Sequence, residues 1–194
     1  AFFEEVGMPR VILMGAPGSG KGTQGEVLSQ AWSVPRLAPG DIFRDHIRRG
    51  TPLGLEVKSY SDAGKLVPDA VVIRVMEERL TAADAQAGWI LDGFPRTVPQ
   101  AEALDELLAQ LGQPCDAILN LDVPEPVLLG RLLQRAQEQN RADDTPAVIQ
   151  NRLQEYYSKT QPLLDFYGER VIRVDGTQSI DRVTAQIQAH LAAT

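Results

Sequence analysis

Short apolar runs alternate with longer amphipathic stretches along most of this chain. The apolar runs have the length of strands, and the stretches between them carry apolar residues at helical spacing. Such alternation is typical of a parallel sheet wrapped by helices, so we predict an α/β fold, a three-layer sandwich of a five-stranded parallel sheet with helices on both faces. Strands are expected at residues 10–14, about 34–38, 88–92, 116–121 and 170–174, and helices at 24–32, 42–49, 70–80, 98–111, 126–139, 146–166 and 180–191.

One stretch breaks this alternation. Residues 40–67 contain only short helical pieces separated by glycines, so we expect a small lobe at 38–67 that is inserted into a single domain spanning 8–194. Two polar residues stand directly ahead of helical stretches. Asp41 and Ser179 are therefore expected to be N-caps.

Composition narrows the range of functions. The 194 residues carry a net charge of −7, and unspecific binding to nucleic acid needs a basic surface, so no nucleic-acid partner is expected. The single cysteine, Cys115, excludes an internal disulfide and a zinc cluster built on cysteines. No apolar run is long enough to cross a bilayer, and no membrane partner is expected. Residues 1–7 lack the pattern of a secretory signal and are interpreted as a cloning remnant or an upstream extension, so we expect a cytoplasmic protein.

The strongest chemical signal follows the first expected strand. There the chain runs into a glycine-rich turn and a helix start, which is the context of a phosphate-binding P-loop. At Gly15, Gly18 and Gly20 we expect backbone angles that other residues avoid, because they let successive N–H groups point at phosphate oxygens. The positive end of the helix and the charge of Lys21 add to this attraction. The expected ATP-binding residues of this P-loop fold are Gly15, Ala16, Pro17, Gly18, Ser19, Gly20, Lys21, Gly22 and Thr23.

A second site is expected after the third strand, because ligands of open parallel sheets bind beyond the carboxyl ends of the strands. Asp92 ends the run of residues 88–92, in the position of a carboxylate that holds hydrated Mg²⁺. It is followed by a Gly-Phe-Pro turn that begins at Gly93 and projects Arg96. A guanidinium can grip a phosphate with two hydrogen bonds, so Arg96 is expected to bind a second phosphate group.

These motifs resemble those of the nucleoside monophosphate kinases, and among them the adenylate kinases. The matching segments, in the family's order, are 15–24, 40–44, 62–69 and 93–97. The resemblance implies that Gln100 reads adenine through its amide, and that the Mg²⁺ accompanying ATP is held largely through water by Asp92 and Thr23. The AMP-binding set that it implies comprises Pro39, Gly40, Arg44, Leu66, Val67, Gly93, Arg96, Gln100, Arg141 and Arg152.

Arginines after the fourth strand extend the resemblance. Arg131 and Arg135 are four residues apart and share one face of a helix, while Arg141 and Arg152 lie on the stretch that returns. In the family such arginines close over the phosphates of both substrates. The short loop at 136–144 implies a brief lid and no zinc site, unlike the long form with its inserted domain. The expected catalytic residues are Lys21, Arg96, Arg135, Arg141 and Arg152, and the ATP site is expected to include also Arg131, Arg135, Gly176 and Gln178.

The prediction is a short-form member of this family, which transfers phosphoryl between Mg·ATP and AMP to give two ADP by positioning and electrostatic stabilisation. The expected binding partners are the nucleotides ATP, AMP and ADP, and the protein is expected to be a monomer. Pro39 departs from the family, which usually carries a base-selecting Thr there, so a UMP/CMP kinase is the alternative. A GTPase-type switch is disfavoured because its Asn-Lys-x-Asp motif is absent. An idle P-loop binding module is disfavoured because every expected charged group is present.

Overall fold

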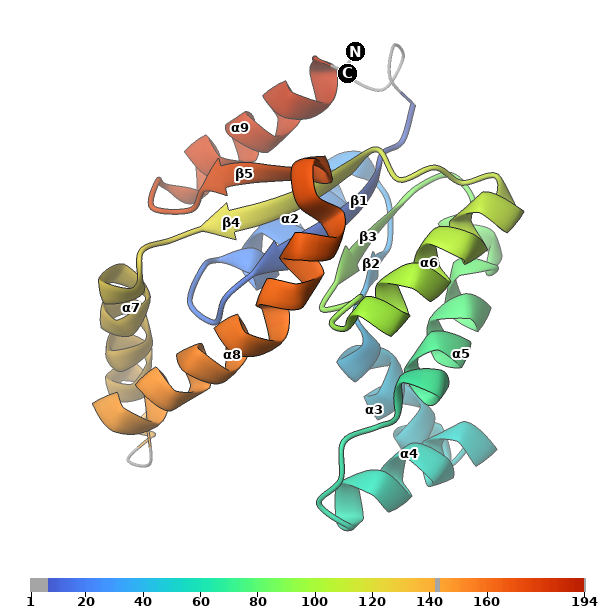
Figure 1. The fold of residues 1–194 in the computed structure, drawn as a ribbon, viewed down its shortest axis with the longest axis horizontal. Coiled ribbons are helices and arrows are strands. Elements are labelled where there is room, and N and C mark those ends of the chain that lie inside the picture. Colours follow the sequence, from blue (N-terminus) through green and yellow to red (C-terminus); the bar gives the residue numbers. More distant parts are fainter. Residues whose placement is uncertain (1–6, 142–143, 194) are drawn as a thin grey trace.

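A computed structural model describes residues 7–141 and 144–193, so residues 1–6 of the expected extension lie outside the described residues. The strands form one five-stranded parallel sheet, as the alternation predicts, and their order is β2-β3-β1-β4-β5 (Figure 1). The strands are β1 (Arg10–Gly15), β2 (Arg36–Leu37), β3 (Trp89–Asp92), β4 (Ala117–Asp122) and β5 (Val171–Asp175).

The residues of β1 alternate between the two faces of the sheet, and each face carries its own core. Val11 and Leu13 pack with apolar residues of α2 (Lys21–Trp32) and α9 (Ile180–Ala192). Ile12 and Met14 pack on the opposite face, against α5 (Asp69–Leu80), α6 (Val98–Leu111) and α8 (Pro146–Tyr167). Because β1 is buried on both faces, it reads as a continuous apolar run rather than an alternating one. The three-layer prediction is confirmed.

The remaining helices extend beyond the carboxyl edge of the sheet. In Figure 1, α7 (Glu125–Glu138) and the start of α8 lie on one side of the molecule. On the other side lie α3 (Pro39–Arg49) and α4 (Pro52–Asp62). Short 3-10 turns occur at Ala83–Ala85 and Gly168–Arg170. The P-loop edge of the sheet therefore lies between two projecting helical parts, which we call the α3–α4 lobe (39–62) and the α7–α8 arm (125–152).

The start of α3 differs from the prediction. The helix begins at Pro39 with Ala38 as its N-cap, so Asp41 lies in the first turn and is not the cap. Proline suits the first helical position because its φ is already helical and the N–H that it lacks would have no helical partner there. Ser179 is confirmed as an N-cap, since its hydroxyl accepts from the backbone N–H of Arg182.

The helix α4 was also missed, because only short helical pieces were expected there. Its N-cap is Thr51, whose hydroxyl accepts from the N–H of Gly54 at 3.0 Å. Gly54 lowers the helical propensity of the segment, yet a Cβ at this position would lie 2.2 Å from the carbonyl oxygen of His46 in α3. The glycine thus allows α3 and α4 to approach closely, which no local pattern indicates.

Cys115 lies at the boundary of the core. It is half-buried and packs against the face that carries α5, α6 and α8. Its thiol donates to the carbonyl oxygen of Ala117 at 3.3 Å, and burial raises its pKa to about 11. Among the described residues no helix is long and apolar enough to span a membrane.

Candidate functional site

The turn between β1 and α2 has the predicted conformation at two of its glycines. Gly18 and Gly20 have φ angles of 84° and 90°, in the left-handed region that glycine adopts readily. The expectation of an unusual angle at Gly15 is wrong, because Gly15 ends β1 without a positive φ. A Cβ at Gly15 would lie 2.5 Å from the hydroxyl oxygen of Ser19. The absence of a side chain there allows the turn to fold back closely on the strand.

Lys21 and Asp92 meet at the carboxyl edge of the sheet. Lys21 begins α2, Asp92 ends β3, and the ammonium group donates to Oδ1 of the carboxylate. Asp92 is only 2% exposed, and its other oxygen is bound by Arg36. Burial alone would raise the pKa of Asp92, but the charges and hydrogen bonds of Lys21 and Arg36 outweigh it and leave the pKa below its ordinary value. The carboxylate is therefore a fixed negative charge beside the P-loop.

Arg36 was not among the predicted site residues. It lies on β2, the neighbour of β3, and its Nε donates to Oδ2 of Asp92 at 2.8 Å. Its Nη1 donates to Asp41 at 3.3 Å, and the other oxygen of Asp41 accepts from Arg44. The ion pairs thus form a continuous series from Lys21 to Arg44, which we call the strand-end ion-pair chain. Its signal in the sequence was an arginine within an otherwise apolar run.

The turn after β3 presents Arg96 to solvent. Gly93 has a φ of 80°, and the Phe94–Pro95 bond is cis. The Nε of the exposed Arg96 donates to the carbonyl oxygen of Gly93 at 2.9 Å, and within the described part of the chain its two Nη groups have no partner. Gln100 lies one turn into α6, where it accepts from the backbone N–H of Arg96 and donates to Asp69. Arg96 can therefore take up an anion without breaking an existing ion pair.

Arg131 joins two loops at the carboxyl edge of the sheet. From α7 its guanidinium donates to the carbonyl oxygen of Gly18 at 3.0 Å and to that of Gly176 at 2.9 Å. Gly176 follows β5, and a Cβ there would lie 2.6 Å from Val123. Gln178, in the same turn, donates to Asp175 at 3.2 Å. The P-loop and the β5–α9 turn, both predicted to bind ATP, are thus held together by a residue predicted for the same site.

The other arginines of the α7–α8 arm are exposed. Arg152 is paired with Asp144 at 2.7 Å, and its side chain is 59% exposed. Arg135 and Arg141 are exposed, and across residues 7–141 and 144–193 their side chains have no hydrogen bond or ion pair. Part of the predicted lid, residues 142–143, lies outside the described residues. Among the described residues, these three guanidinium groups have no hydrogen bond or ion pair to the P-loop.

The predicted acceptor-binding residues between 39 and 67 lie at the start of α3 and in the segment between α4 and α5. Pro39 begins α3, and a Cβ at Gly40 would lie 3.4 Å from the Arg44 guanidinium. Leu66 is 82% exposed, whereas Val67 is half-buried and packs against apolar residues of α5. An exposed leucine next to a packed residue leaves an apolar surface in position to cover a flat ligand.

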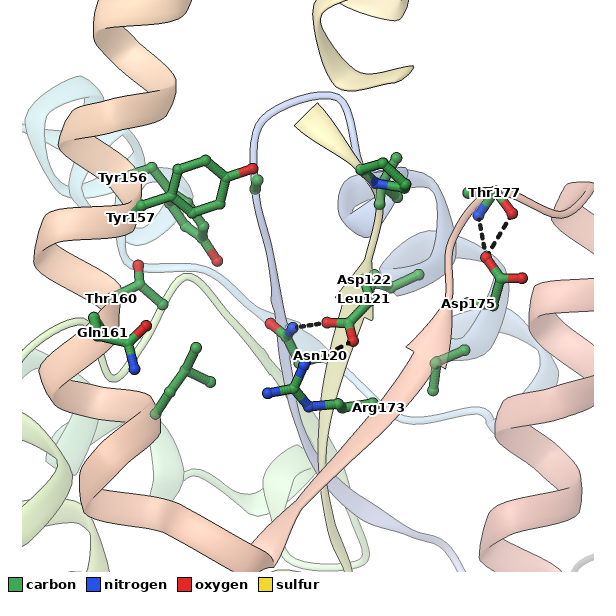
Figure 2. Close-up of a pocket in the computed structure, with 15 residues that line it drawn as sticks. Asn120, Leu121, Asp122, Tyr156, Tyr157, Thr160, Gln161, Arg173, Asp175 and Thr177 are labelled. Atoms are coloured by element: carbon green, nitrogen blue, oxygen red, sulfur yellow. Dashed lines mark hydrogen bonds and ion pairs between the residues drawn. The ribbon is translucent and has the colours of Figure 1, made fainter. Parts of the chain in front are cut away.

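A cavity of about 840 Å³ lies beside this site and was not predicted (Figure 2). Across it, side chains of α8 that include Tyr157 and Gln161 face the β4–β5 half of the sheet. On the sheet, Asp122 accepts from the amide of Asn120 and from Arg173 at 3.3 Å. Ala16 alone among the residues predicted to bind ATP lines the cavity. The cavity is therefore a neighbour of the predicted donor site.

The acidic side chains near the P-loop bear on whether a metal ion could bind there. Among the described residues, no group of three or more His, Cys, Asp and Glu side chains could hold a metal ion. Asp92 nevertheless offers an ionised carboxylate beside the P-loop, and Thr23 offers an exposed hydroxyl on α2. Mg²⁺ commonly keeps several waters and is bound by one or two carboxylates plus substrate phosphates. These two residues fit a magnesium ion that arrives with a nucleotide.

Comparisons with known proteins agree with the geometry. A family model described as adenylate kinase matches residues 13–172. A protein called adenylate kinase from Cyanothece sp. is 54% identical over 93% of this chain and 94% of its own length. One of the same name from Leptospira biflexa is 48% identical over 93% of this chain and 98% of its own. One from Stenotrophomonas maltophilia is 46% identical over 95% of this chain and all of its own length.

Proposed function

The chain belongs to the adenylate kinase family and transfers a phosphoryl group between ATP and AMP, and on this premise we propose which of its residues bind each nucleotide. The relatives favour this reaction over that of a UMP/CMP kinase. Phosphoryl transfer needs little covalent help from a protein. Its transition state is stabilised by positioning and by charges aimed at the phosphoryl oxygens, so we assign no general base.

We propose that ATP binds across the P-loop. Backbone N–H groups of the P-loop, other than at Pro17, surround its phosphates, and Lys21 moves from Asp92 to those phosphates when they arrive. The contact of Arg131 with both Gly18 and Gly176 supports a donor site between the P-loop and the β5–α9 turn. Gln178 would lie at the far end of that site, away from the reacting phosphate.

AMP is proposed to bind on the opposite side of the sheet edge. Arg96 and Arg44 anchor its phosphate, and Leu66 and Val67 cover its base, which Gln100 reads. The exposed guanidinium of Arg96 and the exposed side chain of Leu66 support this placement. Pro39 and Gly40 would contact AMP through the start of α3, in the lobe that we propose as the acceptor-binding part of the chain.

The exposed arginines of the α7–α8 arm are proposed to complete the site. We propose that further closure of the arm brings Arg135, Arg141 and Arg152 onto the transferring group, since none of them has a hydrogen bond or ion pair to the P-loop among the described residues. Arg135 and Arg141 have no ionic partner within residues 7–141 and 144–193, and Arg152 is itself exposed although it pairs with Asp144. Closure of this short lid would also exclude water, which would otherwise hydrolyse ATP.

Magnesium is the proposed cofactor, with Asp92 and Thr23 as its protein partners through water. When bound, the ion would neutralise charge that develops on the phosphate oxygens. Asp92 keeps a negative charge in place for it because its pKa lies below the ordinary value. We also propose a cytoplasmic monomer. An unpaired thiol at Cys115 is typical of reducing compartments, and the exposed large apolar side chains are distributed over several separate elements.

The guanidinium of Arg96, in the turn after β3, is exposed and has no ionic partner among the described residues, and this observation carries the proposed division into donor and acceptor sites. Initial rates with Mg·ATP and AMP, GMP, CMP or UMP test it, with fast ADP formation expected for AMP. Arg96→Ala should then raise the KM for AMP and lower turnover, while ATP affinity stays within a few-fold. Equal losses of affinity for both nucleotides would contradict the assignment of Arg96 to the acceptor.

A further inference from the structure

Gln100 is held by two partners whose hydrogen-bonding character is fixed. The backbone N–H of Arg96 donates to its Oε1 at 2.9 Å, and its Nε2 donates to Oδ1 of Asp69 at 2.8 Å. A backbone N–H can only donate and a carboxylate only accepts, so these partners leave one possible orientation for the amide. Gln100 is 5% exposed, so water cannot readily replace either partner.

We infer that Asp69 is a specificity-determining positioning residue, an inference that rests on the proposed reading of the acceptor base by Gln100. An amide has two N–H donors and a carbonyl oxygen that accepts twice. Asp69 and Arg96 each use one of these, so one N–H and one acceptor direction stay available for a ligand. Asp69 thereby fixes the order in which Gln100 offers its donor and its acceptor to the base.

The fixed order matches adenine and opposes guanine. Adenine presents a ring nitrogen that accepts, N1, next to an amino group that donates, N6. Guanine presents the reverse, a ring N1–H next to the acceptor O6. An amide with its N–H and its carbonyl oxygen held in place can pair with only one of these two edges in a given base position. The two purines have the same size, so this order separates them where shape cannot.

Guanine cannot simply turn the amide over. A flipped Gln100 would place its NH₂ group against the N–H of Arg96 and its carbonyl oxygen against the carboxylate of Asp69. The first contact would place a donor against a donor and the second an acceptor against an acceptor. At a buried side chain these polar groups would be left without hydrogen-bond partners. The position of Asp69 is itself secure, because it is the first residue of α5 and the later turns of that helix are buried in the core.

The alternative is that Asp69 only ties α5 to α6. This would affect stability, and through it every acceptor alike, but it would not change the preference for one purine. The ratio of kcat/KM for AMP to that for GMP, with Mg·ATP as donor, therefore separates the two explanations. The KM for ATP and the melting temperature are measured beside it.

Asp69→Ala should lower the AMP-to-GMP ratio by about tenfold, because the amide loses one of its two fixed partners. Asp69→Asn should keep the ratio within about twofold, since its carbonyl oxygen can still accept from Nε2. The matched control is Arg74→Ala, which breaks the exposed pair of α5 with Glu56 and should leave the ratio unchanged. An unchanged ratio in Asp69→Ala, or an equal change in Arg74→Ala, would overturn the inference.

A second variant keeps the test open if Asp69→Ala unfolds. Gln100→Met is of similar size but has neither the N–H for N1 of adenine nor an acceptor for its amino group, so the ratio should fall by more than about tenfold. Retention of the wild-type ratio would refute reading by donor order. Failure of the proposed function is distinguishable, because the wild-type protein would then show no fast reaction with AMP at all.

Discussion

The strand-end ion-pair chain and the α7–α8 arm carry similar charged groups in opposite conditions. In the strand-end ion-pair chain, Asp92 is almost fully buried, and Lys21 and Arg36 each bind one of its carboxylate oxygens. On the arm, Arg135 and Arg141 are exposed, and they have no ionic partner within residues 7–141 and 144–193. One region has its charges satisfied before any ligand arrives, whereas the other has charges that a ligand would satisfy.

The difference teaches how a phosphoryl-transfer site can be stable without substrate. A buried charge is tolerated only with partners, so the charges at the sheet edge come in matched sets. An exposed guanidinium group needs no ionic partner because water solvates its charge. Its attraction to a phosphate becomes strong only when a closing arm excludes that water. We therefore expect substitutions in the two regions to separate stability from turnover.

The largest effect is expected for Lys21→Met. Turnover with ATP and AMP should fall about a hundredfold to a thousandfold, because a charge aimed at the phosphates is lost. The fold should persist, since Arg36 still pairs with Asp92. Initial rates and a thermal melt of the same sample test this expectation. Activity within tenfold of the wild type would mean that Lys21 only neutralises Asp92, and the comparison would fail.

Arg141→Ala should follow with a loss of turnover of about tenfold or more, as one of several guanidinium groups is removed from the transition state. Its free energy of unfolding should stay within about 0.5 kcal/mol of the wild type, because its side chain has no hydrogen bond or ion pair with the described residues. Kinetics and urea unfolding measure the two quantities. If stability fell along with turnover, the arm would not be the region with free charges.

Arg36→Met should reverse that pattern. The free energy of unfolding should fall by about 1–3 kcal/mol, because one oxygen of the buried Asp92 loses its charged partner. The matched control is Arg152→Met, which removes a 59% exposed guanidinium from its pair with Asp144 and should cost at most about 1 kcal/mol. Equal destabilisation by both variants, measured by urea unfolding, would erase the difference between the two regions.

The smallest effect is expected on the stability of the fold at low pH. Because the pKa of Asp92 is lowered in the folded protein, protons bind more readily to the unfolded chain. The resulting stabilisation is fully present above the ordinary aspartate pKa near 3.8 and is lost as the pH falls through the lower folded value. Unfolding midpoints should therefore decline less steeply in this window for Asp92→Asn than for the wild type. Parallel curves would show that the ion pairs contribute no net stability there.

Much of the fold could be predicted because local patterns agree with it. The helix over residues 98–111 has the predicted bounds, since Thr97 caps it and Gly112 ends it. The helix α4 could not be predicted, because its Gly54 is explained by a close approach to His46 that depends on tertiary packing. The strand expected at 34–38 shrinks to two residues for a related reason, since only its pairing with β3 defines it.

For the site, the motifs indicated the P-loop and the charged residues that follow the strands, but not how those residues are connected. Arg36 reaches Asp92 because β2 lies next to β3 with Arg36 opposite Ile90. The sequence of neither strand predicts that the two are neighbours. The left-handed angles at Gly18 and Gly20 were predictable, whereas the role of Gly15 depends on how the turn folds back. Connections between distant segments are thus what sequence reasoning missed.

The low reactivity of the single cysteine allows dyes to be attached selectively at other positions, so that motion of the protein can be followed. Dyes that label cysteine react with the thiolate, and at a pKa of about 11 Cys115 holds almost none near neutral pH. Reporter cysteines can therefore be placed at exposed sites, such as Leu55→Cys on α4 and Gln137→Cys on α7, with the native residue left in position. Energy transfer between two dyes would then follow the distance between lobe and arm as nucleotides bind, one molecule at a time.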